Sequence, residues 1–148
     1  TTRGGVMANV LVVANRTAES PELIDALRER AARGDAVFTL LVPSTPHGVA
    51  WAADMHSGGS EAEGHMNAAV ENMRAAGMEV AGGKVGDPDP IAAVQDEVNF
   101  TTYDEVIVST LPGGISKWLK LDLPHRVERV TGLPVTHVVA HETKVASG

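Results

Sequence analysis

The sequence predicts an α/β fold: a three-layer, doubly wound sheet of five parallel strands with about four helices. Two observations support this prediction. Apolar, β-branched runs, which are typical of strands buried on both faces, alternate along the chain with segments of helical periodicity. Capping residues, glycines and prolines separate each run from the next. The chain has 148 residues, 43% of them hydrophobic, which is enough for one globular domain with its own core.

The first three elements are indicated within the first 43 residues. Residues 9–14 (NVLVVA) form an apolar run that predicts the first strand. Ser20 is a good helix cap, because proline and an acidic residue follow it at positions where both favour a helix. We expect this helix to end at Gly34. Residues 36–42 then predict a second buried strand, which Pro43 stops.

The middle of the chain carries an unusually long polar segment. Residues 44–60 are rich in glycine, and connections of this length are often functional. The sequence from Ser60 to Glu63 has the capping-box pattern, which predicts that the second helix begins there. Met66 and Met73 share one face of this helix and are most simply core residues.

The second half of the chain continues the alternation. The remaining elements are a weaker strand over residues 78–85, a helix capped by Asp89, a strand over 105–108, a helix over 122–131 and a strand over 134–140. Val127 and Val130 are expected to face the core from the fourth helix. These elements indicate a single domain over residues 7–142, with disordered ends at 1–6 and 143–148.

Composition excludes several classes of protein. The formal net charge of −7 argues against bulk nucleic-acid binding, which depends on a basic surface. The chain has no cysteine, which excludes disulfide scaffolds and thiol catalysis and fits a cytoplasmic location. No apolar run is long enough to span a membrane, so we expect no membrane partner.

The segment after the fourth strand is the leading candidate for a binding site. Ligands of doubly wound sheets bind beyond the carboxyl ends of the strands. Glycines there allow backbone N–H groups to approach an anion, while hydroxyls and a lysine add donors and charge. The candidate residues are Ser109, Thr110, Gly113, Gly114, Ser116 and Lys117. A phosphate site and a tight turn beside a solvated basic helix both explain this pattern.

Two further strand ends carry polar residues. After the first strand, Asn15 could bind a base edge or a ribose hydroxyl, and Arg16 and Thr17 follow it. A plain strand-to-helix loop explains these residues as well. After the third strand come Gly86 and Asp87. An aspartate in a turn before a proline-started helix needs no ligand to explain it.

In the order of these features, the chain resembles the universal stress protein family. The resemblance rests on VLVVAN in the first strand, LLVP in the second, the GDPDP turn and the segment DEVIVSTLPGGIS. The string STLPGGISKWLKLDLPHRVERVTGLPVTHV is similar to an actinobacterial-type branch. The resemblance implies a five-stranded parallel sheet of order 3-2-1-4-5, a homodimer, and bound ATP or AMP, with Mg²⁺ accompanying ATP. The fifth strand is the expected dimer edge, because edge strands favour pairing with a partner.

The resemblance also implies particular binding residues. Ala14 and Asn15 match the adenine-side end of the first strand, and Val42 matches a backbone position that contacts the base. Gly86 matches the turn after the third strand. The glycine-rich segment matches the phosphate loop. The chain departs from nucleotide-binding members there, because the expected closing Gly-Ser or Gly-Thr pair is absent and Asp122 lies nearby.

These observations favour a nucleotide-binding regulatory domain without catalytic residues. In this hypothesis the nucleotide bridges the two loops and orders residues 44–60. The alternative is a dimeric interaction module of the same fold that has lost nucleotide binding. A slow ATP hydrolase ranks last, because no paired carboxylates or positioned base are evident. The six histidines show no clustered metal-ligand pattern, so we predict no metal site in the protein itself.

Overall fold

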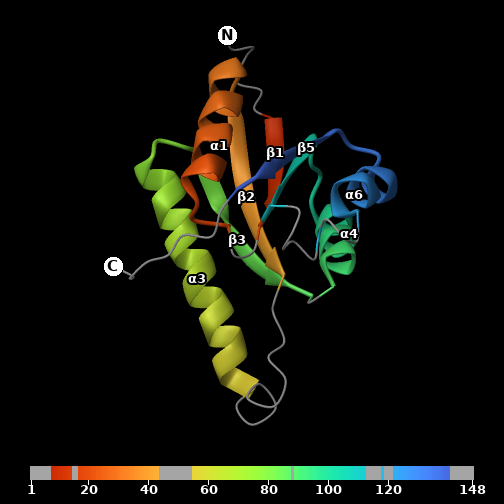
Figure 1. Cartoon of the computed structure of the whole chain (residues 1–148). Coiled ribbons are helices and arrows are strands. Elements are labelled where there is room, and N and C mark those ends of the chain that lie inside the picture. Colours follow the sequence, from red (N-terminus) through yellow and green to blue (C-terminus); the bar gives the residue numbers. More distant parts are fainter. Residues whose placement is uncertain are drawn as a thin grey trace.

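The protein folds as one twisted sheet covered by helices on both faces (Figure 1). The structure is a computed structural model that describes residues 8–14, 17–43, 55–87, 89–112, 118 and 122–140, with side chains of the second helix described from residue 63. The strands are β1 (Ala8–Val13), β2 (Ala36–Pro43), β3 (Val80–Gly86), β4 (Glu105–Thr110) and β5 (Val135–Val139). The helices are α1 (Pro21–Arg33), α3 (Met55–Ala75), α4 (Pro90–Phe100) and α6 (Leu123–Thr131).

The sheet has the predicted topology. Its strand order is β3-β2-β1-β4-β5, and all four neighbouring pairs are parallel. β1 is central and pairs with β2 on one side and β4 on the other. The chain therefore changes direction across the sheet between β1 and β4, which is where doubly wound folds form their ligand crevice.

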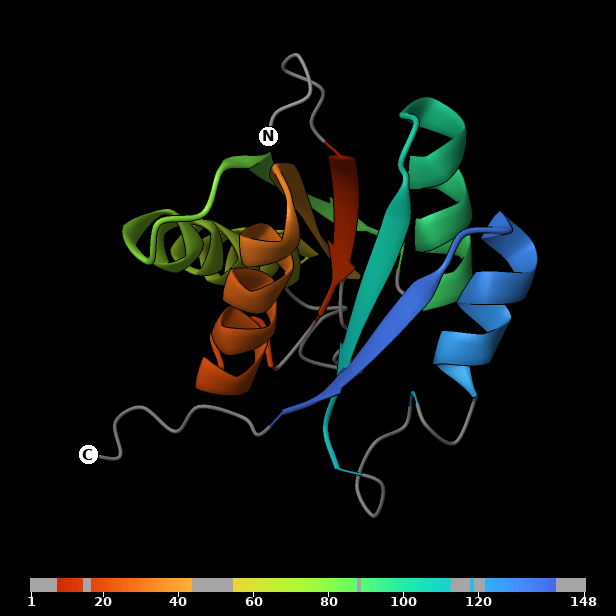
Figure 2. The same ribbon diagram turned by 90° about the horizontal axis from the view of Figure 1, so that it is seen from above.

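Two hydrophobic cores lie on opposite faces of the sheet. Alternate residues of β1 serve different cores, since Val10 and Val12 face one and Leu11 and Val13 face the other. α1 and α3 cover the first face, and α4 and α6 cover the second, as the view in Figure 2 shows. Burial on both faces explains why β1 is a continuous apolar run rather than an alternating one.

The predicted helix boundaries are confirmed where local capping sets them. Ser20 caps α1, and its side chain accepts a hydrogen bond from the Leu23 amide at 3.1 Å. Asp89 caps α4 and accepts from the Ile91 amide at 3.0 Å. Gly132 ends α6 in the left-handed conformation, with φ 71°. Such signals act over a few residues and can be read from sequence alone.

Three predictions about elements are wrong. α3 begins at Met55, so Ser60 lies inside the helix and does not begin it. β4 continues to Thr110, which places two predicted loop residues at the end of a strand. Val127 is fully buried, but Val130 is 41% exposed, because the short α6 turns only a narrow stripe toward the sheet.

The predicted ends of the domain, at residues 1–6 and 143–148, lie outside the described residues. So does most of the long polar segment. Because α3 begins at Met55, the hypothesis that a ligand orders the long polar segment applies only to the part of that segment before Met55. Among the described residues, no helix is both long and apolar enough to cross a membrane.

Candidate functional site

The candidate site lies where the carboxyl ends of β1 and β4 meet. Val13, the last residue of β1, pairs with Val108 of β4, so the segment after β1 starts beside the last two residues of β4, Ser109 and Thr110. Ala14 is fully buried directly after β1, and its amide donates to the Leu41 carbonyl of β2 at 3.2 Å. The sheet thus holds the start of the first loop in a fixed place beside the end of β4.

A buried hydroxyl pair joins the segment after β1 to the end of β4. The Thr17 and Ser109 hydroxyl oxygens lie 2.6 Å apart, and either can be the donor. Both residues are at most 2% exposed. They stand 92 positions apart in the sequence, so this hydrogen bond is created by the fold. It holds Thr17, in the segment after β1, against Ser109 near the end of β4.

Thr110 faces the other side of the sheet and binds β5. Its hydroxyl lies 2.8 Å from Nε2 of His137. The backbone continues the link, since the Ala140 amide donates to the Thr110 carbonyl at 2.8 Å. Partial burial lowers the pKa of His137, which lies in an exposed position of β5, because loss of some of the ring's water disfavours its charged form.

Ser109 and Thr110 were expected in a loop and are instead the last residues of β4. Both are buried, and each already has a side-chain partner. Their side chains hold β4 to the segment after β1 and to β5. The loop after β4 starts after them, at Leu111, and their proposed ligand contacts stay predictions.

Two other predicted residues lie at neighbouring strand ends. Val42 is 1% exposed near the end of β2, so its side chain belongs to the core and only its backbone could contact a base. Gly86 ends β3, and an added Cβ there would lie 2.9 Å from the Cβ of Ala93. The close approach of α4 accounts for a glycine at this position.

Six of the predicted binding residues fall outside the described part of the chain: Asn15, Arg16, Gly113, Gly114, Ser116 and Lys117. Their proposed roles stay predictions. Trp118, which follows them, packs against the core beneath α4 and α6.

Asp122 and Asp87 both have local partners. The Asp122 carboxylate lies 2.9 Å from Nδ1 of His125, and its side chain does not cap α6. Asp87 accepts from the Asp89 amide at 2.9 Å, which is the turn interaction expected without a ligand. Over the described residues, no group of three or more histidine, aspartate or glutamate side chains is arranged to hold a metal ion.

His137 is an exposed residue of β5, as expected of a surface histidine, and what the sequence analysis did not predict is its hydrogen bond to Thr110. Its partner becomes visible only through the register of β5 beside β4. The available signal was its position, three residues before the end of the last apolar run. That placed it near the carboxyl edge of the sheet.

Solved structures with the same fold are universal stress proteins. One from Archaeoglobus fulgidus in complex with dAMP is 15% identical, with 90% of this chain and 98% of that chain covered and a TM-score of 0.61. One from Arabidopsis thaliana with AMP bound is 16% identical, with 94% and 97% covered and a TM-score of 0.60. Another, in complex with cAMP, is 17% identical, with 93% and 100% covered and a TM-score of 0.60.

At these identities the likeness concerns the fold. No protein-family model matches the sequence, and neither does any curated protein. The chain thus has the fold of the universal stress proteins over nearly its full length, including the strand order that the resemblance implied.

Proposed function

We propose that this chain is a universal-stress-type regulatory domain that binds an adenine nucleotide, AMP or ATP, between the loop after β1 and the glycine-rich segment after β4. The observation that carries the proposal is the buried Thr17–Ser109 hydrogen bond at the switch point of the sheet. It joins the segment after β1 to the end of β4, the strand that the proposed phosphate segment follows. Proteins of the same fold have been crystallised with AMP, dAMP and cAMP.

Each half of the proposed site has a chemical task. Ala14, Asn15 and the backbone of Val42 would hold the base and ribose, beside Arg16 and Thr17. The phosphates would meet backbone N–H groups of Gly113 and Gly114 and the Ser116 hydroxyl. The positive charge of Lys117 would compensate for the hydrogen-bond donors of the missing glycine–serine pair. Mg²⁺, if ATP is the ligand, would arrive with the nucleotide.

The test is a calorimetric titration of nucleotide-stripped protein with AMP and with ATP and Mg²⁺. We expect saturable binding near one nucleotide per chain. Lys117→Ala should weaken binding about tenfold or more, because a hydrogen bond to a charged group contributes about 1.5–3 kcal/mol. Arg28→Ala is the matched control, since Arg28 is a basic residue exposed on α1. No saturable heat together with an unshifted melting temperature would contradict the proposal.

A second function, a dimeric interaction module without nucleotide, is favoured by β5. β5 is the outer strand of the sheet, and its Val139 is 47% exposed. Outer strands with exposed apolar residues favour pairing with another chain. Sedimentation should then show a dimer that Val139→Lys disrupts. A monomer at all concentrations would rule this function out.

A further inference from the structure

A groove lies between the outer strand β3 and helix α4, away from the β1–β4 switch point. Its volume is about 500 Å³. Leu41, Gly86 and Ala93 line it with apolar groups, and Phe100 lies at its rim. Of the residues proposed above for nucleotide binding, this groove contains Gly86 alone. The proposed nucleotide site therefore does not account for this groove.

A buried ionic network forms one wall of the groove. Glu97 is 6% exposed, and its carboxylate accepts from Lys84 at 3.0 Å and from the Tyr103 hydroxyl at 2.6 Å. Burial and the bond to Glu97 raise the pKa of Tyr103, so the phenol stays protonated and keeps donating. Lys84 is neutralised by this pairing and leaves no net positive charge on the wall.

Phe100 is the most exposed large hydrophobic side chain among the described residues, at 77%. The ring is nonetheless held in place, because the Lys84 ammonium lies 4.3 Å from its centroid. An aromatic side chain that is both exposed and oriented costs little entropy to bury. Residues of this kind dominate the affinity of many protein interfaces.

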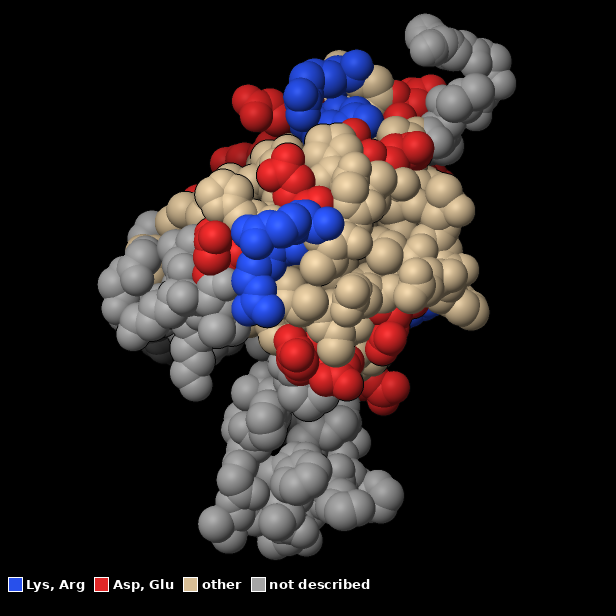
Figure 3. Space-filling view, turned by 90° about the vertical axis from the view of Figure 1, so that its right-hand side faces the viewer, with Lys and Arg blue, Asp and Glu red and all other residues tan. Residues whose placement is uncertain are grey.

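Among the described residues that line the groove, the charged side chains outside the Lys84–Glu97 ion pair are negative. Asp87 and Asp96 line it and are exposed, and Asp89 stands beside them at the start of α4. Figure 3 shows acidic side chains gathered along the lower rim of the face that α4 and α6 form. With Lys84 and Glu97 neutralising each other, the groove presents a net negative surface to a partner.

We propose that the β3–α4 groove docks a short basic segment of a partner protein. An apolar side chain of the partner fills the space between Leu41, Ala93 and Phe100. A neighbouring lysine or arginine lies against Asp87 and Asp96. Addition of a β-strand to β3 is disfavoured, because this outer strand carries Lys84 and three glycines, which are features that oppose edge pairing.

The first experiment uses two labelled peptides of equal length, one of leucine, alanine and arginine and one with glutamate in place of arginine. Binding is followed by ¹⁵N-edited NMR of the full chain. We expect the basic peptide to shift the amides of Gly86, Ala93 and Asp96 in a saturable way. The acidic peptide should leave them unchanged. Equal binding of both peptides, or shifts located elsewhere, would overturn the proposal.

Variants then test the groove itself. Phe100→Ser and Asp96→Lys change exposed positions, so the fold should survive, and each should weaken the basic peptide about tenfold. Val130→Ser is the matched control, because it removes an exposed hydrophobic residue of α6 outside the groove. Unchanged binding in Phe100→Ser would overturn the proposal. A dimer in sedimentation that Phe100→Ser abolishes would do so too, by showing that a second copy of the chain occupies the groove.

Discussion

The hydroxyls of Thr17 and Ser109 form the polar link between the loop after β1 and the end of β4. Thr17→Val keeps the shape of the side chain and leaves the Ser109 hydroxyl buried without this partner. We expect a loss of about 1–3 kcal/mol in the free energy of unfolding, measured by urea denaturation. Adding Ser109→Ala should restore part of the loss, because both polar groups are then gone. Fully additive losses would mean that the two hydroxyls do not act as a pair.

His137 gives the protein a specific dependence of stability on pH. Its pKa is lowered in the folded state, so the unfolded chain binds the proton more readily. The neutral ring contributes fully above about pH 6.5, and stability falls as the pH drops through that value. His137→Gln should flatten this part of a melting-temperature profile. His125→Gln, an exposed histidine of α6, is the control and should leave the His137 part of the slope intact.

At the level of single residues, the sequence predicted roles that depend on near neighbours. The caps Ser20 and Asp89 are confirmed because their partners lie two or three positions away. Met66 and Met73 are confirmed as core residues for the same reason, since helical spacing fixes their face. The hydrogen bond of His137 was not predicted, because its partner Thr110 lies on another strand.

Among the elements, α4 shows most directly how packing constrains a residue type. It approaches β3 so closely that a Cβ at Gly86 would lie 2.9 Å from Ala93 and 3.1 Å from Leu41. Gly86→Ala should therefore destabilise the protein by about 1–3 kcal/mol, as overpacking does. Gly64→Ala in α3 is the matched control, with nothing within 4 Å of the added Cβ. It should stabilise the helix by about 0.5–1 kcal/mol, and equal effects of both changes on thermal unfolding would contradict this account.

Element types followed from the sequence more readily than element boundaries. All five strands and the four described helices are where the alternation predicted them. The boundary of α3 differs most, since this helix begins five residues before the predicted cap at Ser60, and β4 ends two residues later than predicted. Inside a continuous helix, a capping-box pattern does not set the start of the helix. The preceding turn already supplies the hydrogen-bond partners that a cap would provide.

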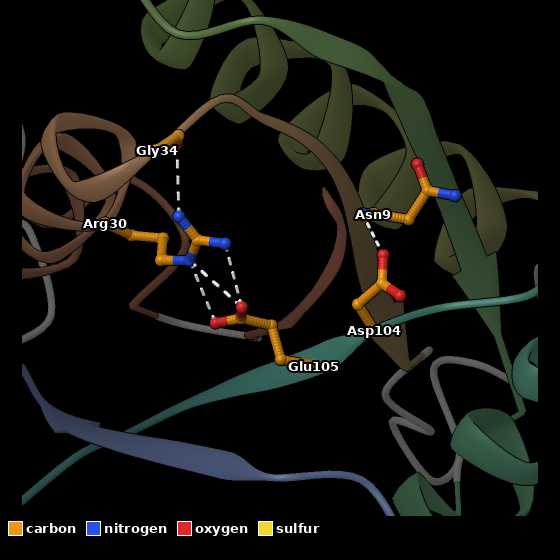
Figure 4. A network of polar contacts seen from close by, with 5 residues as sticks. All are labelled: Asn9, Arg30, Gly34, Asp104 and Glu105. Carbon is orange, nitrogen blue, oxygen red and sulfur yellow. Dashed lines mark hydrogen bonds and ion pairs between the residues drawn. The ribbon is translucent and has the colours of Figure 1, made fainter. Parts of the chain in front are cut away.

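At the scale of the whole molecule, polar contacts at the amino-terminal edge of the sheet connect a helix layer to the sheet (Figure 4). The Arg30 Nε of α1 donates to both carboxylate oxygens of Glu105 in β4 at 3.0 Å. Its Nη1 reaches the Gly34 carbonyl at 3.1 Å. Beside them, the Asp104 carboxylate accepts from the Asn9 amide at 2.7 Å and so fixes β4 to β1. These bonds join a helix layer to the sheet at the end opposite the candidate site.

Breaking the Arg30–Glu105 pair should cost more than the ~0.2–1 kcal/mol typical of exposed pairs. The side chains are only 13% and 22% exposed and meet in a bidentate arrangement. Arg30→Met tests this in chemical denaturation, and the loss should change little with added salt. Arg28→Met is the control, because its pair with Asp25 is exposed and 3.7 Å long. Equal losses in the free energy of unfolding of the two variants would show that the partly buried ion pair stabilises the protein no more than the exposed pair does.

The sequence by itself determined the fold class, the succession of elements and the helix caps at Ser20 and Asp89. Those features depend on hydrophobic periodicity and on hydrogen bonds between residues a few positions apart, which the linear order records. The tertiary structure alone decided that Thr17 meets Ser109, that Thr110 meets His137, and that Phe100 stands exposed over Lys84 beside a groove. These contacts join strands and helices distant in the chain. They exist only after crossovers have set strand order and register, because a shift of one residue would turn each side chain to the opposite face.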